Sequence, residues 1–162
     1  MVRKLFITVL VGVLALAFSN ISVASAGRAI QLNLIQDCST GCSEGVDMLG
    51  PTGFGFINYN QDNTGALRLL VSLKNAEPNT TYSIYLICGP THGTACNFII
   101  VGSITTNRRG NGNSGAIIVP LSTLQGAPFG SGARTDHIDL IAPGGNAAGG
   151  VYVTTNVNYT VP

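Results

Sequence analysis

The stretch "CGPTHGTAC", residues 88–96, places Cys88, His92 and Cys96 at equal spacing, and these residue types bind metal ions or form disulfides. Residues four apart share a face only on a helix, and the glycines and proline of this stretch disfavour a helix. An extended chain would instead set the two cysteines opposite one another at the neck of a loop between two strands. Directly opposed Cα atoms lie about 4.5–5.5 Å apart, which is within disulfide reach. We therefore predict a Cys88–Cys96 disulfide, with a metal site at His92 or free thiols as the alternatives.

A second pair of cysteines, Cys38 and Cys42, lies in "CSTGC". Its polar, glycine-containing surroundings favour a loop closed by a small disulfide ring, although four cysteines allow three pairings and this spacing also suits a metal or redox dithiol. Three acidic residues, Asp37, Glu44 and Asp47, flank the pair. Calcium prefers such oxygen ligands, but their spacing does not match an EF-hand, so we interpret them as a solvated loop.

The stretch "RTDHIDL" contains the other histidine of the chain. If Ile138 and Leu140 face the core, His137 and Asp139 share the outer face, where a histidine–carboxylate pair could act in acid–base catalysis. No nucleophile or third partner can be placed beside this pair. We expect no catalytic residue, no bound metal and no cofactor. The alternative is a copper- or zinc-dependent extracellular enzyme that uses His92 and His137.

The first 26 residues have the pattern of a signal peptide. Arg3 and Lys4 precede an uncharged apolar run of 14 residues, and "ASA" follows at 24–26. The run is shorter than the roughly 20 residues that cross a bilayer, so we predict cleavage after Ala26. The product would be one domain, 27–162, secreted to the extracellular space, the periplasm or the cell surface, without a membrane anchor. Its six basic and seven acidic residues give it no electrostatic footprint for nucleic acid.

Alternation of apolar and polar residues dominates the rest of the chain and predicts about eight short strands. In 65–74, four apolar residues fall on one face, and in 151–162 the valines and Tyr159 are expected to point inward. Such a pattern predicts an all-β fold, either a sandwich or a barrel, and of these we expect a single antiparallel β-sandwich. The expected strands are 29–36, 53–60, 65–74, 80–88, 97–106, 115–124, 135–142 and 151–162.

The stretch "AEPNTTYSIYL", residues 76–86, resembles the turn and strand of fibronectin type III and related immunoglobulin-like sandwiches. The resemblance implies an immunoglobulin-like sandwich in which Tyr82 begins an inner strand and its hydroxyl returns to the backbone of the preceding turn. About four strands follow this corner here, where a type III domain has one. A second stretch, 102–112, is similar to uncharacterised secreted microbial sandwiches, a likeness that implies no activity.

The polar, weakly charged loops favour a non-enzymatic module that binds an extracellular protein, a glycan or further copies of itself. An inhibitor that presents 107–114 or 89–95 as a rigid loop is a further alternative. Two glycosylation sequons, at Asn79 and Asn158, fall at turn or outward positions of the expected strands.

Overall fold

The computed structural model of the chain describes residues 27–36, 52–88, 97–126, 129–144, 151–154, 157 and 159–162. The predicted signal peptide lies outside these residues. Within them no helix has the length and apolar character that crossing a membrane requires.

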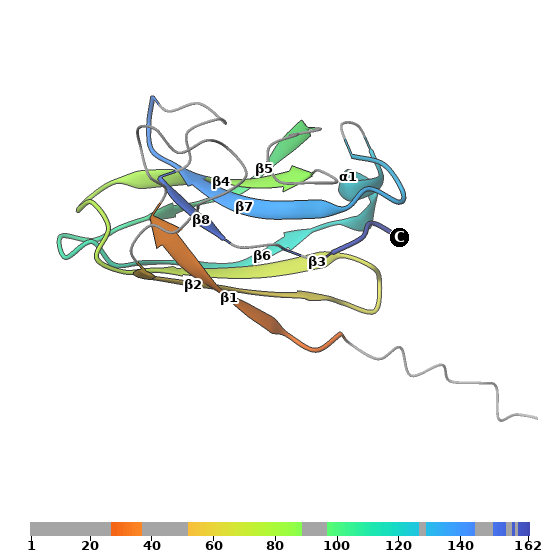
Figure 1. Ribbon diagram of the computed structural model, residues 1–162, viewed down its shortest axis with the longest axis horizontal. Helices are drawn as coiled ribbons and strands as arrows, with labels where there is room; N and C mark the ends of the chain where they lie inside the picture. The colour runs from red at the N-terminus through yellow and green to blue at the C-terminus, as the bar shows by residue number, and fades with distance from the viewer. Residues whose placement is uncertain are drawn as a thin grey trace, which may run out of the picture.

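The prediction of an all-β fold is confirmed, since eight antiparallel strands form one sheet and a five-residue helix is the single helix of the described residues (Figure 1). Neighbouring strands follow the order β5-β4-β7-β8-β1-β2-β3-β6. The strands are β1 (Ile30–Gln36), β2 (Thr52–Gln61), β3 (Leu67–Leu73), β4 (Thr81–Cys88), β5 (Asn97–Thr105), β6 (Gly112–Val119), β7 (Thr135–Ile141) and β8 (Tyr152–Thr154), and the helix is α1 (Leu121–Gln125).

The sheet is nearly closed, because its two end strands, β5 and β6, approach each other. A Cβ atom built on Gly102 of β5 would lie 2.9 Å from Cδ1 of Ile117 on β6, so the Ile117 side chain packs directly on the backbone of Gly102. In Figure 1 the sheet folds over, with β4 and β7 above β2, β3 and β6. The core fills the space between these two parts of one continuous sheet.

Alternation explains which side chains enter this core. Leu67, Leu69, Val71 and Leu73 on β3 are buried, whereas Arg68 between them is exposed, as the sequence predicts. On β7, Ile138 and Leu140 are fully buried. Side chains two residues apart on a strand share one face of the sheet, so each strand contributes a row of apolar groups to the interior.

Two predicted elements differ from the structure. β6 begins at Gly112 rather than 115, because a bulge with Gly115 at a positive φ of 67° lets the strand extend through the polar, glycine-rich sequence. It ends at Val119, since Pro120 lacks the N–H that a strand ladder needs. The expected last residues of that strand form α1 instead.

The expected final strand is also divided. Only Tyr152–Thr154 forms β8, and Tyr152 rather than Val153 joins the main core. Val157, Tyr159 and Val161 then enter the core as predicted, from a segment bound to the chain before and at the start of β7. The phase of the alternation therefore changes between β8 and this segment, which a continuous strand could not do.

The tyrosine of the predicted corner lies in the core. Tyr82 packs edge-on against Tyr152, with ring centroids 5.6 Å apart, and the ring centroid of Phe54 lies 4.9 Å from that of Tyr152. Burial, together with the neighbouring Tyr82, raises the pKa of Tyr152 to about 12. The aromatic cluster thus joins β2, β4 and β8 from different parts of the chain.

Candidate functional site

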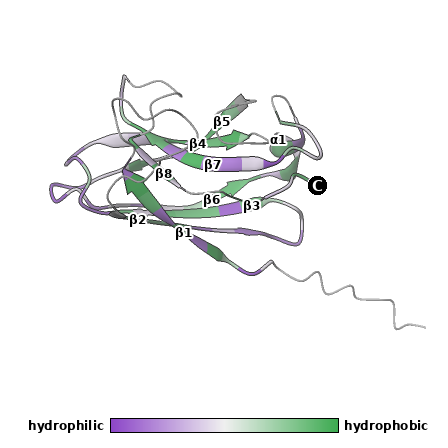
Figure 2. Cartoon of the chain, viewed as in Figure 1, coloured by the Kyte–Doolittle hydropathy of each residue, from purple (hydrophilic) through white to green (hydrophobic). Residues whose placement is uncertain are grey.

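The outer face of β7 carries a histidine between two carboxylates. Nδ1 of His137 lies 3.0 Å from Oδ2 of Asp136, and its Nε2 lies 3.2 Å from Oδ1 of Asp139. Because Ile138 and Leu140 point into the core, β7 places His137 and Asp139 together on the opposite face, as predicted. Figure 2 shows this alternation as hydrophilic and hydrophobic stretches along β7.

The cluster is far more buried than a surface pair on an exposed strand would be. The side chain of His137 is 14% exposed and that of Asp139 is 5% exposed. Burial by itself lowers the pKa of His137, but the carboxylates of Asp139 and Asp136 outweigh it, so the pKa is raised. The Oδ1 atom of Asp139 is buried, and Nε2 of His137 lies 3.2 Å from it.

Sequence reasoning identified His137 and Asp139 but missed Asp136, which precedes the histidine directly. The arrangement suits an imidazolium, since a ring with a carboxylate at each nitrogen needs a proton on both. A general base needs one ring nitrogen turned towards the substrate, whereas both nitrogens of His137 face carboxylates here. The geometry therefore favours a buried charge cluster over a catalytic histidine.

No group of three or more His, Cys, Asp or Glu side chains in the described part of the chain could hold a metal ion. His92, Asp37, Glu44 and Asp47 lie outside the described residues, as does Asn158. The metal alternative and the acidic-loop interpretation therefore stay predictions. Asn79 is exposed, at a turn with a φ of 52°, which is consistent with its predicted turn position.

Cys88 is buried at the end of β4, and the other three cysteines lie outside the described residues. The ladder between β4 and β5 sets Asn97 opposite Cys88. Asn97 is the residue that follows Cys96 in the chain. Both disulfide pairings, Cys88–Cys96 and Cys38–Cys42, stay predictions.

The loop of the predicted inhibitor is a compact turn. Oδ1 of Asn107 accepts hydrogen bonds from the backbone N–H groups of Arg109 and Asn111, at 2.8 and 3.2 Å. Gly110, with a φ of 74°, donates to the Asn107 carbonyl and packs so closely on the backbone of Ala76 that no Cβ would fit. The turn leaves its arginines exposed but offers no extended binding segment over 107–111. The other inhibitor segment, 89–95, lies outside the described residues.

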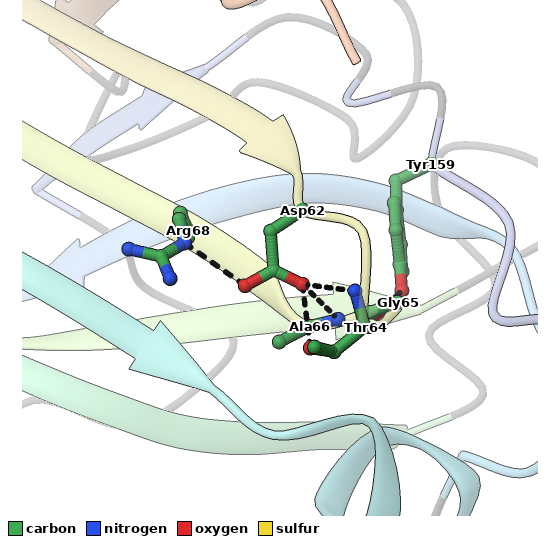
Figure 3. A network of polar contacts seen from close by, with 6 residues as sticks. All are labelled: Asp62, Thr64, Gly65, Ala66, Arg68 and Tyr159. Atoms are coloured by element: carbon green, nitrogen blue, oxygen red, sulfur yellow. Dashed lines mark hydrogen bonds and ion pairs between the residues drawn. The ribbon is translucent and has the colours of Figure 1, made fainter. Parts of the chain in front are cut away.

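A second polar network, at the β2–β3 turn, ties distant parts of the chain together (Figure 3). Oδ1 of Asp62 accepts hydrogen bonds from the backbone of Thr64 and Ala66 and from the Thr64 hydroxyl, and Oδ2 accepts one from Arg68. Bonds from Thr64 are the main cause that lowers the pKa of Asp62 to about 2. The Tyr159 hydroxyl donates to the carbonyl of Gly65, 94 residues away. The network closes the β2–β3 turn and joins it to the segment that contains Tyr159.

An apolar surface lies next to the His137 cluster, on the outer side of β4 and β5. Ile100 is 61% exposed and Phe98 is 45% exposed. Tyr85 is directly opposite Ile100, and its ring centroid lies 5.3 Å from that of Phe98. Tyr85 is also opposite Asp139 in the ladder with β7. We name Tyr85, Phe98 and Ile100 the β5 patch.

Sequence reasoning missed the β5 patch, although a signal was available. The run "FIIV", 98–101, has no polar residue between its apolar ones, so both faces of the strand are apolar. A strand with one face in water alternates. The unbroken run therefore places apolar side chains outside the core as well as inside it.

The fold and these sites define an all-antiparallel β domain with a buried Asp-His-Asp cluster beside an exposed apolar patch. Comparison of the chain with protein-family models, with curated proteins and with solved structures gives no match. The function therefore has to be argued from the residues of this chain.

Proposed function

We propose that this protein is a secreted, non-enzymatic interaction module whose contact surface is the β5 patch. The observation that carries the proposal is the exposure of Phe98 and Ile100 side by side with Tyr85 on one face. Large apolar groups gathered on the surface of a soluble domain mark interaction sites more often than single exposed ones do. Aromatic residues such as Tyr85 and Phe98 are also enriched at protein contacts.

The charge cluster supports a role in binding rather than in catalysis. Asp136 and Asp139 each lie within ion-pair distance of one ring nitrogen of His137, so these two carboxylates position the histidine. In our proposal the cluster fixes the strand that lies behind Tyr85. A rigid support of this kind reduces the entropy that a contact surface loses on binding.

The proposal includes export by the signal peptide of residues 1–26 and stabilisation by two disulfides after export. Disulfides persist in extracellular and periplasmic compartments. It also retains the immunoglobulin-like sandwich as the finer description of the fold, a relationship supported by the burial of Tyr82 at the start of β4. Occupied sequons at Asn79 and Asn158 would be compatible with such a product in a host that glycosylates.

The retention of purified protein on cells of the producing organism tests the proposal. Ile100→Lys places a charge in the β5 patch, and we expect it to lower retention by about tenfold, the effect of losing about 1.4 kcal/mol of binding free energy. Ile118→Lys is the matched control, since Ile118 is 51% exposed on β6, outside the patch. Retention that is equal for both variants and the parent would contradict the proposed contact surface.

A further inference from the structure

β5 has one paired side and one side without a partner strand among the described elements. It pairs with β4 along its whole length and forms one end of the sheet, while β6 forms the other end. The beginning of β5 lies well apart from β6 in the view of Figure 1. Its backbone N–H and C=O groups on that side form a template for another strand.

This edge lacks the features with which edge strands usually avoid other chains. Such strands carry charged residues or proline, or are very short. Asn97–Thr105 contains neither a charge nor a proline, and β6 packs on its second half, from Gly102 onward, so the free edge is its first part. Its bulge lies after Ile100, so 97–100 is a regular stretch. The other end strand, β6, is interrupted by a bulge near its middle.

From these features we infer that the free edge of β5 binds the same edge of a second copy of this chain, as an antiparallel strand pair. The inference rests on the proposed function and names the partner of the β5 patch. With Phe98 of one copy opposite Ile100 of the other, both side chains lie on the outer face, because directly opposed residues of an antiparallel pair share a face. The two patches then join into one apolar strip.

Charge favours a second copy over a different peptide. An uncharged edge meets no like charge when it pairs with itself. The domain of residues 27–162, with six basic and seven acidic residues, also carries too little net charge to repel its own copies at long range. A foreign peptide would find no charged group on β5 through which its sequence could be recognised.

The geometry also fixes the size of the assembly. Pairing of β5 with β5 uses the same surface on both copies and closes at two, whereas pairing of β5 with β6 of the next copy would continue as an open filament. The edge is short, so we expect a weak dimer whose population depends on concentration.

Sedimentation velocity of the purified protein between about 1 and 100 µM, a range in which weak dimers dissociate, tests the inference. We expect the parent to shift from monomer to dimer over this range. Ile100→Lys should raise the dissociation constant at least tenfold, about 1.4 kcal/mol, since each lysine would lie opposite Phe98 of the other copy and place a charge within the apolar strip. Ile118→Lys should leave it unchanged.

Melting curves control for folding, and Ile100→Thr, which keeps a strand-forming residue without the charge, replaces the lysine variant if that variant melts early. A monomer at all concentrations, an open-ended polymer, or a dimer unaffected by both Ile100 variants would overturn the inference. If the parent is monomeric while its retention on cells still depends on Ile100, the proposed function stands and its partner is another molecule. If neither property depends on Ile100, both fail.

Discussion

His137 shows how neighbouring residues decide what a titratable group does. A histidine and a carboxylate two residues apart on a strand predict an acid–base pair, and the spacing places them correctly. The sequence does not reveal that Asp136 reaches the other ring nitrogen, because alternation assigns that residue to the opposite face. With Asp136 included, the histidine has a carboxylate at each ring nitrogen, an arrangement that favours its charged form.

The raised pKa of His137 predicts that stability depends on pH. The cluster stabilises the fold fully below the pKa of an unfolded histidine, about 6.5, and this contribution is lost as the pH rises through the higher folded value. We expect the urea midpoint of the parent to fall as the pH rises above about 6.5. His137→Gln, which cannot carry the charge, should be less stable at pH 5 by about 3–5 kcal/mol, the usual cost of removing one partner of a buried pair.

The control for this prediction is Asp62→Asn, which should keep the parent's dependence above pH 6 because Asp62 lies in a separate network. Unfolding curves that respond to pH equally in the parent and in His137→Gln would contradict the assignment of the titrating group.

Asp62 predicts the opposite response to acid. Its folded pKa, about 2, is below the value of about 3.9 for an unfolded aspartate, so its contribution is present above pH 4 and lost as the pH falls through 2. Asp62→Asn should lower the melting temperature at pH 7 by a few degrees. Between pH 4 and 2 it should lose less stability than the parent does. Thermal melts across this range check the prediction. Arg68→Gln, which removes only the bond from Arg68 to Oδ2 of Asp62, serves as a comparison. An equal loss of stability in the parent and in Asp62→Asn would contradict the prediction.

At the scale of elements, periodicity predicted which side chains of a single strand are buried. It missed the strand limits that depend on pairing with neighbouring strands. The rows of β3 and β7 follow from alternation alone, since each strand has one face against the core. The early start of β6 depends on a bulge at Gly115 and on pairing with β3, a strand more than forty residues earlier in the chain. The end of that strand at Pro120 could have been predicted, because proline removes a ladder hydrogen bond.

The candidate sites also have some features that a single strand determines and others that depend on the order of strands in the sheet. The positions of His137 and Asp139 follow from a single strand, but the burial of their cluster depends on the place of β7 between β4 and β8. The β5 patch exists because β5 is an end strand of the sheet, and strand order is not contained in the pattern of one segment. The unbroken apolar run 98–101 indicates two apolar faces without indicating which of them faces water.

At the scale of the whole molecule, the described residues after β8, 157 and 159–162, complete the core. Val157, Tyr159 and Val161 are buried in the core, and backbone hydrogen bonds join the segment to Ala133 and Thr135. Through its hydroxyl, Tyr159 also reaches the β2–β3 turn at Gly65 (Figure 3). The segment therefore connects two parts of the sheet that are distant in the sequence.

We predict that removal of residues 157–162 unfolds the protein. Each of the three buried side chains contributes about 1.5–3 kcal/mol, and their sum is comparable to the whole stability of a typical domain, about 5–15 kcal/mol. Tyr159→Phe, which keeps the ring and removes only the bond to Gly65, should cost about 1 kcal/mol. Circular dichroism melts of both variants distinguish the core contribution from the hydroxyl bond. A truncated chain that melts cooperatively near the parent temperature would show that this segment lies on the domain without being part of its core.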